Sequence, residues 1–119
     1  LDEKPGGGLR SSETIEQAVA AVSEQSPDAF LFNCTSSDAI TVALGELREL
    51  TDKPIGAYPN RYHIPHGWTL DNEVGTQYLE LSVDGYMEYI EQWKSMGASV
   101  LGGCCGIGPE LIAALAASR

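Results

Sequence analysis

The chain has 119 residues, of which 43% are hydrophobic and 20% are charged, as in an ordinary globular domain. Its 17 acidic and 7 basic residues give a formal net charge of −10, which argues against a nucleic acid or an anionic membrane as a partner, because both need a basic surface. No apolar run is long enough to cross a bilayer, so no membrane partner is expected.

The chain begins with a predicted loop and a predicted helix. Residues 1–10 are Gly-rich and polar and read as a loop. Thr14 and Gln17 have the spacing of a capping box in front of an apolar run, which predicts a helix over about residues 12–25.

Two short strands are predicted on either side of a second helix. The apolar stretch at residues 29–32 has the character of a strand buried on both faces. Residues 35–38 supply N-capping side chains, and apolar residues recur at helical spacing from there to Leu50, so a helix is predicted. A small strand is predicted at residues 55–58.

The second half continues the alternation after a long irregular segment. Residues 59 to about 82 show no clear period, and loops this long within compact domains are usually functional or disordered. A third helix is predicted over about residues 83–96, with Gly97 as its C-cap. A strand at residues 99–102 and a final helix that begins at Pro109 complete the chain.

This order, with three strands and four helices, predicts an α/β fold with right-handed βαβ units and a parallel sheet. A closed (β/α)8 barrel needs roughly 200 residues or more. If the pattern belongs to such a barrel, the 119 residues supply less than half of it.

Three cysteines carry the strongest chemical signal. Cys34 follows the first predicted strand, and Cys104 and Cys105 stand in the run Gly-Gly-Cys-Cys-Gly after the last one. An odd number of cysteines, two of them adjacent, is a poor disulfide framework. Free thiols indicate a reducing compartment, so the expected location is the cytoplasm.

The three thiols are expected to meet. The carboxyl ends of parallel strands share one edge of the sheet, and Asn60 follows the second strand at that edge. Three thiolates around Zn²⁺ leave the fourth tetrahedral position open, as in catalytic zinc sites. The hypothesis is a zinc site that activates a substrate thiol, with the metal and the helix at Pro109 lowering the thiol pKa values.

Three motifs together resemble a known family, the zinc-dependent homocysteine S-methyltransferases. They are Asn33-Cys34-Thr35, Tyr58-Pro59-Asn60, and Gly102-Gly103-Cys104-Cys105-Gly106 followed by Pro109. The resemblance covers nearly the whole chain, although Ile107-Gly108 replaces the family's usual pair of threonines and so removes a hydroxyl N-cap. It implies that residues 1–119 are a partial homocysteine S-methyltransferase domain, the carboxyl-terminal part of a (β/α)8 TIM barrel.

By this resemblance, Cys34, Cys104 and Cys105 correspond to the zinc ligands. Asn60 corresponds to the residue that can fill the fourth position until the substrate displaces it, and Asn33 lies beside the site. The implied function is zinc-dependent transfer of a methyl group from a small-molecule donor to the thiol of homocysteine or a similar thiol. With homocysteine as the acceptor, the product is methionine.

Other interpretations stay open. The chain can be a non-catalytic fragment, or a module whose zinc only holds the fold. His63 and His66 lie in the irregular loop at 61–82, and one of them can close a structural Cys₃His site. A thiol redox protein is disfavoured because no Cys-x-x-Cys spacing exists. Three strands without further neighbours are also expected to leave open sheet edges, through which the chain can self-associate.

Overall fold

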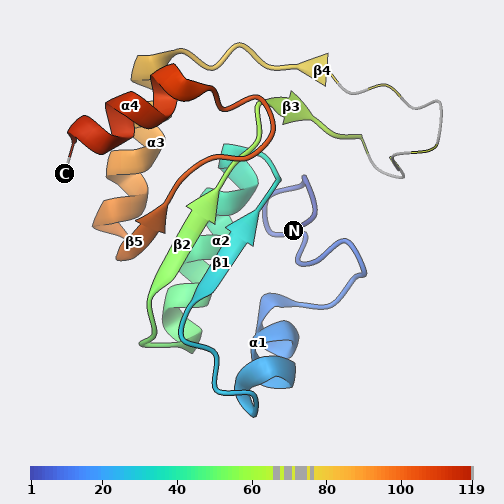
Figure 1. Cartoon of the computed structure of the whole chain (residues 1–119). Coiled ribbons are helices and arrows are strands. Elements are labelled where there is room, and N and C mark those ends of the chain that lie inside the picture. Colours follow the sequence, from blue (N-terminus) through green and yellow to red (C-terminus); the bar gives the residue numbers. More distant parts are fainter. Residues whose placement is uncertain (66–67, 69–70, 72–74, 76, 119) are drawn as a thin grey trace.

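A parallel sheet of three short strands lies at the centre of the fold (Figure 1). The computed structural model describes residues 1–65, 68, 71, 75 and 77–118. Strand β2 (Ile55–Tyr58) lies between β1 (Phe30–Asn33) and β5 (Ala98–Leu101), and both neighbours run parallel to it. The predicted α/β class with parallel βα units is confirmed.

Four helices accompany these strands in the predicted order. They are α1 (Ile15–Ser23), α2 (Ser37–Leu50), α3 (Val83–Ser95) and α4 (Pro109–Ala117). Helices α2 and α3 connect successive strands, pack against β2 and β5 respectively, and contact each other, which places them on one face of the sheet (Figure 1). Among the described residues, none of the helices combines the length and apolar character that a membrane crossing requires.

Capping side chains fix where α1, α2 and α3 begin. The Thr14 hydroxyl accepts a hydrogen bond from the Gln17 N–H, and the Gln17 side chain accepts one from the Thr14 N–H, so the predicted capping box is confirmed. Because Thr14 itself is extended, α1 begins at Ile15, later than predicted. The hydroxyls of Ser36 and Ser82 accept hydrogen bonds from backbone N–H groups in the first turns of α2 and α3.

The core lies between the helices and the sheet. Tyr86, Ile90 and Trp93 lie at helical spacing on one face of α3, and all three are fully buried. The Tyr86 hydroxyl donates a hydrogen bond to the Gly102 carbonyl (2.8 Å), and burial raises the pKa of Tyr86 to about 12, so the donor keeps its proton. This contact ties α3 to the backbone just before Cys104.

The segment between β2 and α3 differs from the prediction of a single irregular loop. Two short strands, β3 (Tyr62–His63) and β4 (Gln77–Tyr78), form an antiparallel pair. The rings of Tyr62 and Tyr78 pack edge to face across this pair, with centroids 5.5 Å apart. Strands of two residues are too short to leave an alternating pattern in the sequence. His66, in the connection between them, lies outside the described residues.

The sheet has two open edges within the part of the chain that the structure describes. β1 and β5 each pair with β2 alone, and Leu31 on β1 is 38% exposed. Unpaired N–H and C=O groups on an edge strand are a template for pairing with another chain.

We therefore expect the 119-residue chain, expressed by itself, to self-associate through these edges. Its elution in size-exclusion chromatography should shift toward larger species as the concentration rises. Leu31→Lys places a charge on edge strand β1 and should reduce the association. Leu50→Lys changes a similarly exposed leucine at the end of α2 and should leave the association unchanged. A monodisperse monomer at every concentration would contradict this prediction.

Candidate metal centre

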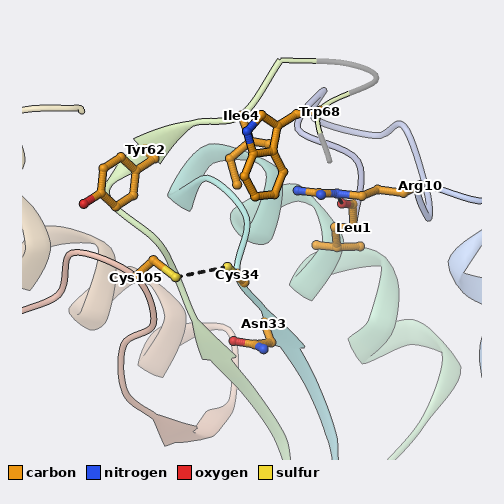
Figure 2. A pocket seen from close by; sticks show the side chains of 8 residues that line it. All are labelled: Leu1, Arg10, Asn33, Cys34, Tyr62, Ile64, Trp68 and Cys105. Atoms are coloured by element: carbon orange, nitrogen blue, oxygen red, sulfur yellow. Dashed lines mark hydrogen bonds between the residues drawn. The ribbon is translucent and has the colours of Figure 1, made fainter. Parts of the chain in front are cut away.

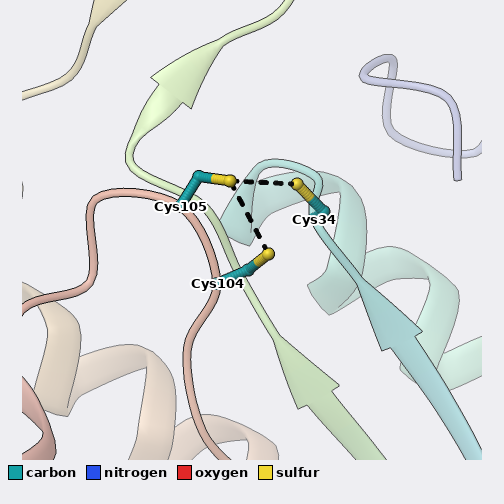
Figure 3. A group of neighbouring side chains, drawn as sticks. All are labelled: Cys34, Cys104 and Cys105. Atoms are coloured by element: carbon teal, nitrogen blue, oxygen red, sulfur yellow. Dashed lines mark hydrogen bonds between the residues drawn. The ribbon is translucent and has the colours of Figure 1, made fainter.

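The three cysteines meet at the carboxyl edge of the sheet (Figure 3). The Sγ atoms of Cys34 and Cys105 are 3.8 Å apart, and those of Cys104 and Cys105 are also 3.8 Å apart. All three sulfurs lie within 4.8 Å of one another, and none takes part in a disulfide. The predicted convergence of the thiols is therefore observed.

These separations fit a zinc ion. With Zn–S bonds near 2.3 Å, the edge of a tetrahedron of sulfurs around zinc is about 3.8 Å. Two of the three sulfur pairs already have this separation, so little movement of the chain is needed to hold the ion. Thiolates are soft ligands, which suit zinc rather than the hard cations Mg²⁺ and Ca²⁺. The cluster can therefore bind a metal ion of the zinc type.

Cys34 occupies a strained position directly after β1. Its backbone has φ 54°, in the left-handed region, which costs a non-glycine residue roughly 1–3 kcal/mol. The Cys34 N–H donates to the Tyr58 carbonyl (2.9 Å), and the carbonyl of Thr35 accepts from the Asn60 N–H (3.1 Å). The chain at and just beyond the end of β2 thus holds the turn that carries the thiol.

The residues that follow β2 also hold the loop that carries Cys104 and Cys105. The Cys104 N–H donates to the Pro59 carbonyl, and the Arg61 N–H donates to the Cys105 carbonyl, both at 2.8 Å. Gly106 has φ +79°, and a β-carbon at this position would lie 2.9 Å from Cβ of Arg61. Only glycine satisfies both constraints, so Gly106 lets the cysteine loop lie close against Arg61.

The two asparagines predicted for the site lie beside Cys34. Asn60 is 2% exposed; its Nδ2 donates to Sγ of Cys34 (3.9 Å), and its Oδ1 accepts from the Tyr62 N–H (3.0 Å). The amide nitrogen rather than the oxygen therefore faces the sulfur. Asn33 ends β1 and lines the pocket next to Cys34 (Figure 2).

Burial shapes the electrostatics of the cluster. It raises the pKa of the Cys104 thiol to about 11, and a hydrogen bond with Cys34 acts in the same direction. Burial thus sets the direction at Cys104 in the metal-free protein, and the lowering of the thiol pKa values by a bound metal and by the helix at Pro109 stays a prediction. Gly108 caps α4 without a side-chain hydrogen bond, as the missing threonine pair predicts.

A pocket of about 420 Å³ opens beside Cys34 and Cys105 (Figure 2). Its volume is within the range of small-molecule sites. Tyr62 and Trp68 supply aromatic surface, and Arg10 supplies a positive charge. No carboxylate is among the described residues that line it. A small ligand in this pocket can therefore reach two of the three sulfurs.

The histidine alternative finds no support among the described residues. There, the group of side chains close enough to share one metal ion consists of the three cysteines and does not include His63. His63 lies in β3 and is exposed. His66 lies outside the described residues.

Sequence reasoning missed three residues near the cluster. Tyr62 and Arg10 line the pocket, and Glu3 forms hydrogen bonds with Thr35 and Ser36 directly after Cys34. Glu3 and Arg10 lie in a segment that reads as a loop, and no local pattern links Glu3 to a partner 32 positions away. For Tyr62 a signal existed, because it follows Asn60 closely at the edge of the sheet.

A family model described as homocysteine S-methyltransferase matches residues 2–118. The chain belongs to the homocysteine S-methyltransferase family. Homocysteine S-methyltransferase 3 of Arabidopsis thaliana is 33% identical over 107 residues, which are 90% of this chain and 30% of that protein. Selenocysteine methyltransferase of Astragalus bisulcatus is 33% identical over 113 residues, 92% of this chain and 32% of that protein.

Solved structures of the family have the same local fold. The metallated form of the homocysteine methyltransferase MmuM from Escherichia coli matches with a TM-score of 0.72 and 27% identity. The match covers 100% of this chain and 34% of MmuM. The chain therefore spans about a third of the length of these relatives.

The cysteine loop also leads to a stability prediction. A β-carbon on Gly103 would lie 2.2 Å from Cγ2 of Ile107, so Gly103→Ala forces a shift in the loop. We expect this variant to lower the free energy of unfolding by about 1–3 kcal/mol, measured by urea denaturation of the metal-free protein. Gly75→Ala is the matched control, because a β-carbon there meets no atom of the described residues within 4 Å. Equal stabilities for the two variants would show that the loop has room to relax.

Proposed function

We propose that residues 1–119 belong to a protein that transfers a methyl group to the thiol of homocysteine or a similar small thiol, with the help of zinc. The main support is the meeting of Cys34, Cys104 and Cys105 at separations that suit tetrahedral zinc, in a chain of this family. A metallated form is among the MmuM structures that match the chain, which also supports metal binding.

The domain is proposed to be the carboxyl-terminal part of a (β/α)8 barrel. The parallel sheet with helices on one face supports this, since barrel strands are covered by helices on the outside only. The open edges of β1 and β5 are where neighbouring barrel strands would pair. The relatives are about three times as long as the match, which leaves room for those strands.

The proposed roles of the residues follow from their positions. Cys34, Cys104 and Cys105 would hold the zinc ion, and three protein ligands are the number typical of catalytic zinc sites. When bound, Zn²⁺ stabilises the thiolate form of the acceptor, which is the nucleophilic form. Asn60 flanks the cluster and donates to Cys34, and Asn33 lines the pocket from which the acceptor reaches the sulfurs.

The transfer is a direct displacement. The acceptor thiol releases its proton to solvent, and an electron pair of its sulfur forms the new bond to the methyl carbon. The bond between that carbon and the donor's heteroatom breaks, and both of its electrons stay with the donor. The contribution of the chain is to hold the sulfur in line with the methyl group, which lowers the entropic part of the barrier.

The names of the relatives indicate the class of the acceptor. Homocysteine and selenocysteine, named for the relatives in Arabidopsis and Astragalus, are amino acids with a nucleophilic sulfur or selenium. We propose an amino acid of this kind as the acceptor.

The cytoplasm is the proposed location, because three free thiols persist best in a reducing compartment.

Cys104→Ser is the first test of the zinc site. The protein should bind about one equivalent of zinc, and the variant should bind none stoichiometrically, because a serine hydroxyl is a far weaker zinc ligand than a thiolate. Metal analysis after dialysis, with competition by a chromogenic chelator, measures both. His63→Ala is the control and should retain the metal. Full retention by Cys104→Ser would count against the site, and loss in His63→Ala would support a closed structural site instead.

X-ray absorption at the zinc edge separates a catalytic from a structural metal. On addition of homocysteine, the zinc should exchange one nitrogen or oxygen neighbour for sulfur, so that the sulfur count rises from about three to about four. Methionine, which has no thiol, is the control ligand and should leave the spectrum unchanged. A spectrum that homocysteine does not alter would mean that the zinc only holds the fold.

A further inference from the structure

Glu3 holds the two residues that follow Cys34. Its Oε1 accepts a hydrogen bond from the Thr35 hydroxyl, and its Oε2 accepts one from the Ser36 N–H, both at 3.1 Å. The Glu3 side chain is only 14% exposed, although it belongs to a Gly-rich loop. One carboxylate thus binds two successive residues of the turn between β1 and α2.

This turn needs such support because the backbone of Cys34 has a left-handed conformation, with φ 54°. Residues in sparsely populated conformations persist only where the surroundings over-determine them. Thr35 is fully buried, and its hydroxyl finds its acceptors in Glu3 and in the Asp2 carbonyl (3.4 Å). The segment around Glu3 therefore supplies polar partners for both residues that follow Cys34.

A carboxylate at this place is electrostatically unfavourable unless it is compensated. The chain carries a net charge of −10, and three thiolates lie nearby when a metal is bound. The start of α2 offers part of the compensation, because N–H dipoles there favour an anion. Arg10 also contributes, with its Nη2 atom 3.4 Å from Oε1 of Glu3. Arg10 also donates from Nε to the Leu1 carbonyl (3.1 Å), which fixes the segment that carries Glu3.

We propose that Glu3 is a positioning residue that fixes the turn after Cys34 and thereby aims its thiol at Cys104 and Cys105. The proposal rests on the zinc site proposed above and adds a residue that lies outside its ligands. The hydrogen bonds of Glu3 go to Thr35 and Ser36 rather than to a sulfur. Replacement of Glu3 should therefore weaken zinc binding and distort the arrangement of the thiols without removing a ligand.

Glu3→Ala is the main variant, tested in the intact protein with zinc and cobalt as probes. Because residues that orient metal ligands typically contribute about 10- to 100-fold to affinity, we expect zinc to bind weaker by that factor. The visible absorption bands of bound Co²⁺ should shift as the tetrahedron distorts. Glu13→Ala, which removes an exposed carboxylate from the same part of the chain, is the matched control and should change neither reading.

Glu3→Gln distinguishes positioning from a general effect of charge. An amide can accept from the Ser36 N–H and donate to the Thr35 oxygen, since a hydroxyl can act as donor or acceptor. We therefore expect Glu3→Gln to bind zinc within about threefold of the unsubstituted protein, well inside the loss typical of a missing orienting residue. Equal losses in Glu3→Ala and Glu3→Gln would overturn the proposal in favour of charge.

Further outcomes keep this proposal separate from the proposed function. If the unsubstituted protein binds no zinc, both fail; if it binds zinc and Glu3→Ala binds it equally well with the same Co²⁺ spectrum, only the role of Glu3 fails. Should Glu3→Ala not fold, Thr35→Val takes its place, because it removes the hydroxyl that Glu3 holds. This variant should show a similar loss of zinc affinity, and unchanged affinity would overturn the proposal.

Discussion

Residues 58–61 hold both cysteine-bearing loops by main-chain hydrogen bonds, and the geometry of the thiols depends on this. Two of these bonds go to the loop after β1, at Cys34 and the residue after it, and two go to the loop after β5, at Cys104 and Cys105. The segment thus bonds alternately to its two neighbours, as a central strand does, although β2 itself ends at its first residue. The sulfurs converge because their loops are fixed against the same stretch of backbone.

Much of this arrangement could be predicted because it depends on local patterns and on one general rule. Capping residues and helical spacing locate the helices, and Trp93 is buried where its position on α3 requires. The meeting of the thiols follows from the rule that parallel strands end at a common edge. Contacts between distant segments follow no such rule. The bond from Thr35 to Glu3 joins residues 32 positions apart, and the orientation of the Asn60 amide depends on the placement of β3.

An amide dipole, rather than the cation of nearby Arg61, faces the sulfur of Cys34. Asn60 directs an amide N–H toward Cys34, whereas the nearby guanidinium of Arg61 lies over the ring of Tyr78 (4.9 Å) and pairs with Glu110 (3.7 Å). Without a metal, burial keeps the proton on Cys104. A divalent cation held by the three cysteines would supply the charge that thiolates need, so metal binding and thiol deprotonation would be coupled.

The role of residues 58–61 has a consequence for how the sequence can vary. Contacts made by the main chain place few demands on side chains, so many substitutions are compatible with them. They are not compatible with a change in the number of residues. Inserting or deleting one residue would reverse the direction in which each following N–H and C=O group points, and one loop would lose its partners. The spacing of the three thiols is thus encoded in the length of a segment that contains none of the three cysteines.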